Sequence, residues 1–218
     1  GGGGPAAVGL GGAPRPATPE EAAEQLCAAL AQARATGHLC ESAETAMDLA
    51  RELCGDRAVA IEDHPDLSGL AASLRVVDDP WEAEVGVTGV ELAMAETGTL
   101  AMVASPARPR STSLVPPAHV ALVPFSRLVP TFAEGVARLA ALDPRPSNIS
   151  FVTGISRSSD IEMRTVYGVH GPGRVDVLVY PDGDRQPAPR PDDAGADPDP
   201  DANADPDPDP DPDHRSQP

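Results

Sequence analysis

Three polar segments of this 218-residue chain hold the residue types that bind ligands or transfer protons. Each joins glycine to charged or hydroxyl side chains beside an apolar run, as loops do next to the buried strands of an open α/β sheet. If the loops converge on one crevice, they form the functional site. The segments are Ala95-Glu96-Thr97-Gly98-Thr99, Thr153-Gly154-Ile155-Ser156-Arg157-Ser158-Ser159-Asp160-Ile161-Glu162 and Gly168-Val169-His170-Gly171-Pro172-Gly173.

Glu96 of the first segment supports two interpretations equally. Its carboxylate could be a nucleophile or general base for a bound substrate. In a tight loop it could instead accept hydrogen bonds from backbone N–H groups, which needs no ligand. Thr97, Gly98 and Thr99 are candidate ligand contacts beside it.

The second segment predicts an anion site at the start of a helix. Ser159 and Glu162 have the spacing of a capping box, and the N–H groups of a helix start attract anions. Arg157 could hold a carboxylate or phosphate with two hydrogen bonds. The alternative is an ordinary capped helix in which Arg157 pairs with an acidic neighbour. The candidate ligand contacts here are Ser156, Arg157, Ser158, Ser159 and Asp160.

His170 of the third segment is a candidate for proton transfer or for a hydrogen bond to an anion. A single loop histidine is more often a structural group, so both interpretations stay open. His119 follows a polar loop that could close over a ligand, although Pro116-Pro117 indicates a conformational role. His38 and His64 lack metal-ligand spacing and receive no predicted role.

Charge and composition argue against nucleic-acid binding. The formal net charge is −18 and every cation is arginine. Residues 191–218 hold ten Asp and one Arg, which supply −9 of that charge. Such a tail repels phosphate, and the rest of the chain has no basic cluster. We expect the acidic tail to be dispensable for function.

No apolar run approaches the roughly 20 residues that span a bilayer, and no secretion signal is recognisable. A cytoplasmic protein is therefore expected, although the chain begins with Gly1 and not with Met. The three cysteines, Cys27, Cys40 and Cys54, form no C-x-x-C pair. The sequence accordingly predicts no metal site and no iron–sulfur cluster held by this chain.

The organisation of the chain predicts one folded domain, 20–183, between a disordered N-terminal segment, 1–19, and a disordered Pro/Asp tail, 184–218. Thr18-Pro19 starts a helix that runs to about Thr36 and stops at Gly37. A second helix follows Ser42 and ends at Gly55. These two helices are expected to form a helical hairpin, 20–55, packed on the rest of the domain.

Short apolar runs beyond this point predict buried strands that alternate with helices. The alternation is typical of a mainly parallel α/β sheet flanked by helices. The runs are 58–61, 75–77, 85–88, 99–104, 120–124, 149–153 and 175–180, and the helical patterns are 67–74, 90–95 and 131–142.

Taken in order, and with Ser113-Leu114-Val115-Pro116 before His119, the three polar segments resemble the LUD (lactate utilisation) domain family over roughly residues 20–182. The family pattern usually has Pro and Thr where this chain has Ile155 and Ser158. The resemblance implies a fold similar to the sugar-phosphate isomerase and CoA-transferase superfamily.

The resemblance also implies an accessory subunit in the oxidation of L-lactate to pyruvate. It would act beside an iron–sulfur subunit that has its own LUD domain and beside a second redox subunit, with iron–sulfur clusters only in the partner. This chain would carry no cofactor and would bind a small anionic ligand or serve assembly. The alternative is a CoA-transferase-like or sugar-phosphate-type enzyme in which Glu96 reacts with the substrate. No catalytic residue of the family is known that could be assigned here.

Overall fold

The computed structural model describes residues 15–160 and 164–183, with the backbone alone for 158–160 and 164–167. Most of the predicted N-terminal segment and the whole predicted acidic tail lie outside the described residues. The predicted α/β domain, by contrast, lies almost entirely within them.

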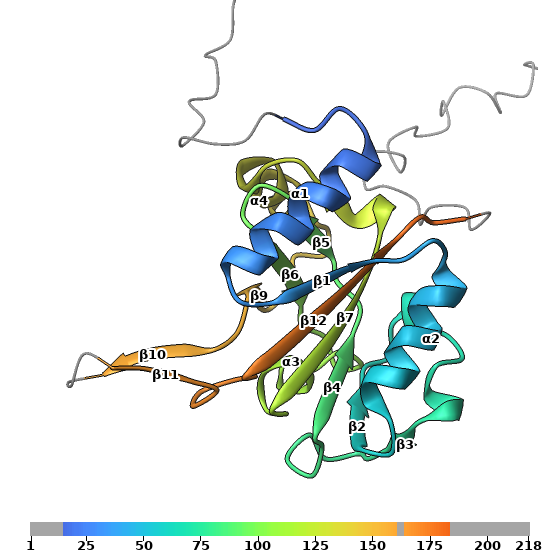
Figure 1. Ribbon diagram of the computed structural model, residues 1–218. Coiled ribbons are helices and arrows are strands. Elements are labelled where there is room, and N and C mark those ends of the chain that lie inside the picture. The colour runs from blue at the N-terminus through green and yellow to red at the C-terminus, as the bar shows by residue number, and fades with distance from the viewer. Residues whose placement is uncertain (1–14, 161–163, 184–218) are drawn as a thin grey trace, which may run out of the picture. The chain divides into compact units, whose positions relative to one another are not determined.

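A six-stranded parallel sheet forms the centre of the domain (Figure 1). Every neighbouring pair of strands in it is parallel. Its inner strands are buried along their length, as expected for apolar runs covered on both faces. The strand order is β1 (Thr36–Leu39), β12 (Arg174–Tyr180), β7 (Ala118–Pro124), β4 (Val85–Thr88), β2 (Ala58–Ile61) and β3 (Arg75–Val76).

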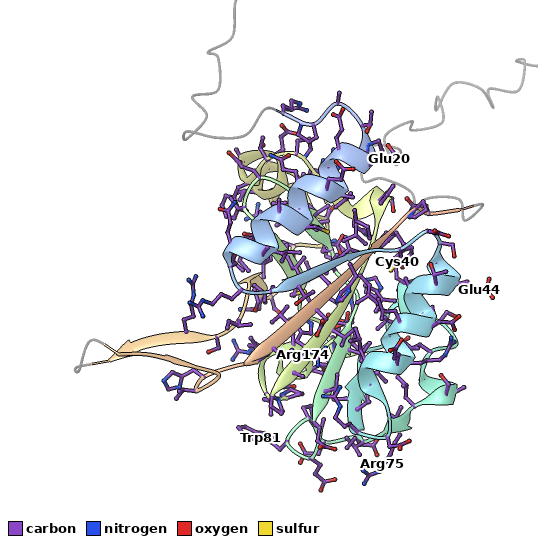
Figure 2. The ribbon with its side chains drawn as sticks, viewed as in Figure 1. Glu20, Cys40, Glu44, Arg75, Trp81 and Arg174 are labelled. Atoms are coloured by element: carbon purple, nitrogen blue, oxygen red, sulfur yellow. The ribbon has the colours of Figure 1, made fainter. Side chains whose placement is uncertain are left out.

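The edge strand β3 is two residues long and carries an exposed arginine, Arg75 (Figure 2). Short charged strands protect a sheet edge from pairing with other chains.

Helices α1 (Pro19–Gln32) and α2 (Ala43–Cys54) cover opposite faces of this sheet. The alternation of side chains along β12 demonstrates this arrangement. Val175, Val177 and Val179 pack in the cluster that contains α1, whereas Leu178 and Tyr180 pack in the cluster that contains α2.

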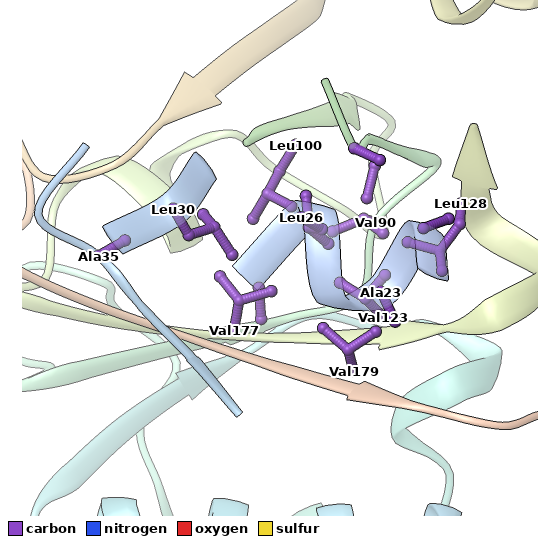
Figure 3. Packing of buried hydrophobic residues seen from close by; sticks show 14 of the residues in the cluster. Ala23, Leu26, Leu30, Ala35, Val90, Leu100, Val123, Leu128, Val177 and Val179 are labelled. Carbon is purple, nitrogen blue, oxygen red and sulfur yellow. The ribbon is translucent and has the colours of Figure 1, made fainter. Parts of the chain in front are cut away.

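A second, four-stranded sheet lies on the other side of α1. Leu100 and Met102 of this sheet pack in the α1 cluster (Figure 3). Ala101, between them, packs with Leu139 of helix α4 (Phe132–Ala140) on the far face. The layers therefore run α2, parallel sheet, α1, second sheet, α4. The second sheet has the order β8 (Leu128–Val129), β5 (Leu92–Met94), β6 (Thr99–Val103) and β9 (Ile149–Thr153).

The remaining elements are short. Helix α3 (Ser111–Leu114) precedes β7, and three 3₁₀ turns, η1 (Pro65–Leu67), η2 (Ala71–Ser73) and η3 (Phe125–Arg127), follow or connect strands. Strands β10 (Arg157–Asp160) and β11 (Arg164–Tyr167) form a separate antiparallel ribbon that extends beyond the two sheets (Figure 1).

The predicted N-terminal helical hairpin is not confirmed, because β1 lies between the two helices and pairs with β12. Helix α1 ends earlier than predicted, at Gln32, and Arg34 makes the left-handed turn with φ +61°. Gly37 is not the helix stop. It lies in β1, where an added Cβ atom would come within 2.6 Å of Cys27 Sγ.

Two predicted helices are also wrong. The segment 67–74 holds two short 3₁₀ turns, because Gly69 between them has a left-handed φ of +83°. The segment 90–95 contains strand β5, because Leu92–Met94 pairs with β6 and is buried between α1 and α4. The predicted helix starts at Thr18 and Ser42 and the stop at Gly55 are confirmed.

Candidate functional site

Glu96 has a structural partner. Its Oε2 atom accepts a hydrogen bond from the backbone N–H of Phe132 at 3.0 Å, at the first residue of α4. Its own backbone N–H donates to the carbonyl of Pro130 at 3.1 Å. The half-buried carboxylate therefore satisfies one of the free N–H groups at a helix start, which is the second of its two interpretations.

Hydroxyl groups join the first segment to the second. Thr97 Oγ1 donates to Thr99 Oγ1 at 2.7 Å, and the Thr99 hydroxyl lies 2.8 Å from that of Thr153. These residues face each other because Thr99 and Thr153 are partners in the β6–β9 pairing. The chain of hydroxyls is thus a cross-strand contact inside the second sheet.

The glycines of these two segments allow the second sheet to pack closely against α1. Gly98 has φ +66°, and an added Cβ atom would lie 2.9 Å from the backbone of Ala29. Gly154 has φ +71°, and its added Cβ atom would lie 2.1 Å from the carbonyl oxygen of Ala33. Both positions need glycine for backbone conformation and for close helix contact, without any ligand.

The second and third segments lie side by side at the amino end of β12. Ser156 N–H donates to the Pro172 carbonyl at 2.8 Å, and Gly168 N–H donates to the Ser156 carbonyl at 3.0 Å. The structure therefore brings the three segments together pairwise, through backbone and threonine contacts.

The helix predicted after Ser159 is wrong. Ser158, Ser159 and Asp160 lie in β10, where they pair with Val166, Thr165 and Arg164 of β11. Glu162, the other half of the predicted capping box, lies outside the described residues. The predicted anion site depended on backbone N–H groups at the start of that helix. Because residues 157–160 form a strand, these groups are not arranged as a helix start.

Arg157 and His170 are both exposed. Within residues 15–160 and 164–183, neither side chain has a hydrogen bond or an ion pair. Glu96 points to α4 instead, so in the described part of the chain no hydrogen bond or ion pair joins the three side chains that the sequence predicted to share one site.

A different group of polar side chains gathers at the carboxyl ends of the parallel strands. Ligands of open α/β sheets bind at this edge. Glu62, His64 and Asp66 follow β2, Glu91 follows β4, and Arg127 follows β7. Arg108 comes from the loop after β6, which is held there by the hydrogen bond from Asp63 N–H to the Ala107 carbonyl at 3.2 Å. We call these six residues the carboxyl-edge cluster: Glu62, His64, Asp66, Glu91, Arg108 and Arg127.

Glu62 is the member whose protonation changes near neutral pH. Burial raises the pKa of its carboxyl group to about 7, and the hydrogen bond from Gly89 N–H, at 2.9 Å, and the positive charge of Arg108 only partly oppose that shift. A carboxyl group with this pKa can hold or release a proton under physiological conditions.

His64 is buried and neutral. Burial lowers the pKa of its imidazole to about 4, and the positive charges of Arg127 and Arg108 add to the lowering. Its Nδ1 atom accepts a hydrogen bond from Asp66 N–H at 3.2 Å, so the proton of the neutral ring is on Nε2. Nε2 is buried and has no hydrogen-bond partner in the described part of the chain. An unsatisfied buried donor of this kind costs about 1–3 kcal/mol.

The two arginines are close to carboxylates but do not hydrogen-bond to them. Arg127 lies 3.6 Å from Glu91 Oε1 and 3.8 Å from Asp66 Oδ2, and Arg108 lies 3.7 Å from Glu91 Oε2. These separations exceed the usual N–H···O range. The guanidinium groups are therefore held by charge, with N–H groups left for another acceptor.

An open depression of about 310 Å³ adjoins the cluster. Glu62 and His64 form part of its wall, together with the 67–71 segment. The arginines are not part of that wall, but their side chains keep 20–26% exposure, so solvent reaches them. This volume is at the lower end of the range for small-molecule sites, so a molecule of a few heavy atoms would occupy only part of the depression.

Sequence reasoning missed this cluster, although a signal for it was present. Glu62 and His64 come directly after the predicted strand 58–61, and Arg127 follows the predicted strand 120–124. In a parallel sheet such positions share one edge. Metal-ligand spacing, which His64 lacks, is not needed by an imidazole that lies alone at the end of a strand.

Two other polar contacts have structural explanations. His38 Nε2 lies 2.9 Å from Asp176 Oδ1, and Arg174 Nε donates to Asp176 Oδ2 at 2.6 Å, which joins β1 to β12 at the start of that strand (Figure 2). His119 is buried between β4 and β7, with Nε2 2.8 Å from the Thr88 hydroxyl. Burial lowers the pKa of His119 to about 4, so this ring is neutral.

The described residues contain no group of three or more His, Cys, Asp or Glu side chains arranged to hold a metal ion. Among the helices of this part of the chain, none combines the length and apolar character needed to cross a membrane.

Known proteins resemble this chain in sequence. It is 40% identical to Lactate utilization protein C of an Exiguobacterium species over 46% of this chain and 45% of that protein. It is 42% identical to the protein of the same name from Bacillus licheniformis, over 46% of this chain and 44% of that protein. It is 37% identical to the one from Macrococcus caseolyticus, over 51% of this chain and 49% of that protein. The matches therefore span about half the length of these curated relatives.

A solved structure supports the fold. A DUF162 family protein from Deinococcus radiodurans superposes with a TM-score of 0.57 at 23% sequence identity, over 76% of this chain and 99% of that one. The family model described as LUD domain matches residues 23–180, which is most of the chain. With the ordered polar segments and the α/β fold, this match confirms the sequence resemblance: the chain belongs to the LUD domain family.

Proposed function

We propose that this chain serves lactate utilisation as an accessory subunit of a system that oxidises L-lactate to pyruvate. The observation that carries the proposal is the 37–42% identity to relatives named Lactate utilization protein C. Since that similarity spans about half of each relative, the role is inferred for the LUD domain. A cytoplasmic location remains a prediction from the sequence.

The partners that we propose are an iron–sulfur subunit with its own LUD domain and a second redox subunit. The cysteines of this chain are poor cluster ligands. Burial raises the pKa of Cys27 to about 11 and also raises the pKa values of Cys40 and Cys54, whereas cluster ligands are thiolates. The proposal therefore assigns the iron–sulfur clusters to the partner and no cofactor to this chain.

We propose the β10–β11 ribbon as the assembly surface. The two strands pair with each other and with no further strand of the described chain. An isolated two-stranded ribbon is marginally stable in water, and its outer edges offer free backbone groups to a partner. A protein surface laid against the ribbon would supply the missing contacts.

Assembly is tested by co-purification of this chain with the proposed iron–sulfur subunit from the same organism. Replacement of residues 158–166 by a short Gly-Ser turn should abolish co-purification while circular dichroism and the unfolding midpoint stay unchanged. Trp81→Ser is the control, because Trp81 is an exposed aromatic residue, 81% accessible, on a loop before β4 (Figure 2). Loss of the complex in the Trp81 variant with retention in the ribbon variant would refute the proposed surface.

The lactate role itself is tested by growth. A strain that lacks this chain should fail to grow on L-lactate and should recover with the wild-type gene, while growth on glucose is unaffected. The Arg157→Ala variant separates the two roles of the second segment. Failure to grow with an intact complex would indicate ligand binding by Arg157, and failure with a lost complex would indicate assembly. Normal growth of the deletion strain on L-lactate would contradict the proposed role.

The alternative enzyme would need Glu96 as a nucleophile. Its Oε2 atom already accepts a hydrogen bond from Phe132 N–H, so the geometry favours the accessory role. Incubation with acetyl-CoA followed by borohydride reduction should give no modified protein. A reducible thioester that forms on the wild type and is absent from Glu96→Gln would establish the enzyme instead.

A further inference from the structure

We propose that the carboxyl-edge cluster binds a small organic monocarboxylate, held by hydrogen bonds from Arg108, Arg127 and His64. This inference goes beyond the lactate role and stands on the geometry of the cluster, so each can fail without the other. None of these residues belongs to the three segments that carry the family resemblance.

Several hydrogen-bond donors of the cluster lack a close acceptor, which a ligand could provide. His64 presents a buried Nε2–H with no partner in the described part of the chain. Arg108 and Arg127 approach their carboxylates only to 3.6–3.8 Å, so their N–H groups also lack close acceptors. A carboxylate offers two oxygens with several lone pairs, and arginine binds it with paired hydrogen bonds. One such ligand would satisfy donors from three separate segments.

The charge balance of the cluster disfavours a dianionic ligand. Arg108 and Arg127 are offset by Asp66 and Glu91, and His64 is neutral. A ligand with two negative charges would meet both acidic side chains without additional compensation. Inorganic phosphate, which is largely dianionic above pH 7, is therefore expected to bind less tightly than a monocarboxylate.

Glu62 makes the binding dependent on pH. Its carboxyl group, with a pKa of about 7, contacts Gly89 N–H from the end of β4 and lies in the field of Arg108 from the loop after β6. The other charged groups of the cluster are Asp66, Glu91 and Arg127. An anionic ligand repels ionised Glu62, so binding favours its protonated form. The affinity should therefore rise as pH falls through 7.

The test is isothermal titration calorimetry of the full chain with acetate, L-lactate and pyruvate, and with lactamide as the uncharged control. At least one carboxylate should bind at pH 6, and lactamide should not. Between pH 6 and pH 8 the affinity should fall about tenfold, which is the change in the protonated fraction of a group with a pKa of about 7. In Glu62→Gln, which keeps a carbonyl acceptor for Gly89 N–H, this fall should disappear.

Arg108→Ala and Arg127→Ala should each reduce the affinity about tenfold or more, and Arg138→Ala on α4 should leave it unchanged. Circular dichroism identifies any arginine variant that does not fold, in which case the Glu62→Gln pH profile alone decides. The proposal is overturned if no carboxylate binds at pH 6, if both folded arginine variants bind like the wild type, if Glu62→Gln keeps the wild-type pH dependence, or if phosphate, titrated at pH 8, binds more tightly there than every carboxylate.

Discussion

Gly89 packs directly against the imidazole ring of His64, and a Cβ atom added to Gly89 would come within 2.3 Å of His64 Nδ1. The same glycine donates its N–H to Glu62 Oε1 at 2.9 Å. One residue without a side chain thus positions both the buried imidazole and the titrating carboxyl group of the carboxyl-edge cluster.

Gly89→Ala should therefore displace the His64 ring. Because the contact lies in a buried layer, we expect a loss of roughly 2 kcal/mol or more in unfolding free energy. Urea unfolding at pH 7 measures it. The matched control is Gly173→Ala, because Gly173 is exposed, has no left-handed φ, and its added Cβ atom would meet only Gly168 Cα at an ordinary contact distance of 3.5 Å. Equal losses in the two variants would show that the His64 contact is unimportant.

Glu62→Gln should change how stability depends on pH. The folded protein raises the pKa of Glu62 from 4.5 to about 7, so between these values the folded state binds the proton more tightly than the unfolded state. Wild-type stability therefore falls, through this group, as pH rises from 4.5 to 7, by roughly 2–3 kcal/mol at most.

Replacement by glutamine removes this penalty, so the variant should gain stability relative to wild type at pH 8 compared with pH 5. Urea unfolding at the two pH values gives the difference. The exposed Glu82→Gln controls for the loss of one negative charge. A Glu62 variant whose difference from wild type is the same at both pH values would contradict the assignment.

Glu96→Ala and Glu96→Gln should differ in stability. Alanine leaves the Phe132 N–H at the start of α4 without its acceptor, which costs about 1–2 kcal/mol. Glutamine retains a carbonyl oxygen and should cost less than half as much. Thermal unfolding of the pair is the measurement, and equally destabilised variants would argue against the helix contact as the role of Glu96.

Gly154→Ala should be more damaging than Gly69→Ala, although both residues have left-handed φ values, +71° and +83°. The backbone conformation alone costs a non-glycine residue about 1–2 kcal/mol. At Gly154 the new Cβ atom would also come within 2.1 Å of Ala33 O, so α1 and the second sheet must separate. Similar unfolding free energies for the two variants would mean that this helix contact relaxes easily.

The sequence predicted the bounds of several strands from their short, mainly apolar runs. The bounds 58–61, 85–88 and 149–153 agree with the structure. Strand β1 was missed because Thr36–Leu39 is short and contains Gly37, which is typical of a helix end. Strand β5 was missed because Leu92–Met94 consists of good helix formers, and only pairing with β6 makes it a strand.

The candidate site was less predictable than the fold. The glycines Gly98 and Gly154 were interpreted as ligand loops, but the requirement for glycine comes from α1, more than 60 residues earlier in the chain. Such long-range contacts leave no local signal. The carboxyl-edge cluster could have been inferred from the predicted parallel sheet, since Glu62 and Arg127 follow predicted strands. The pKa shift of Glu62 depends on burial, which the sequence alone did not indicate.

We assign the ligand chemistry of this domain to the carboxyl edge of the parallel sheet and not to the three polar segments. Backbone amide chemical-shift mapping of the ¹⁵N-labelled chain, titrated at pH 6 with L-lactate and then with pyruvate, tests it most directly. We expect the largest shifts at Gly89 N–H, which donates to Glu62, and at Asp66 N–H, which donates to His64. Shifts confined to residues 96–99, 153–157 and 168–173 would contradict it.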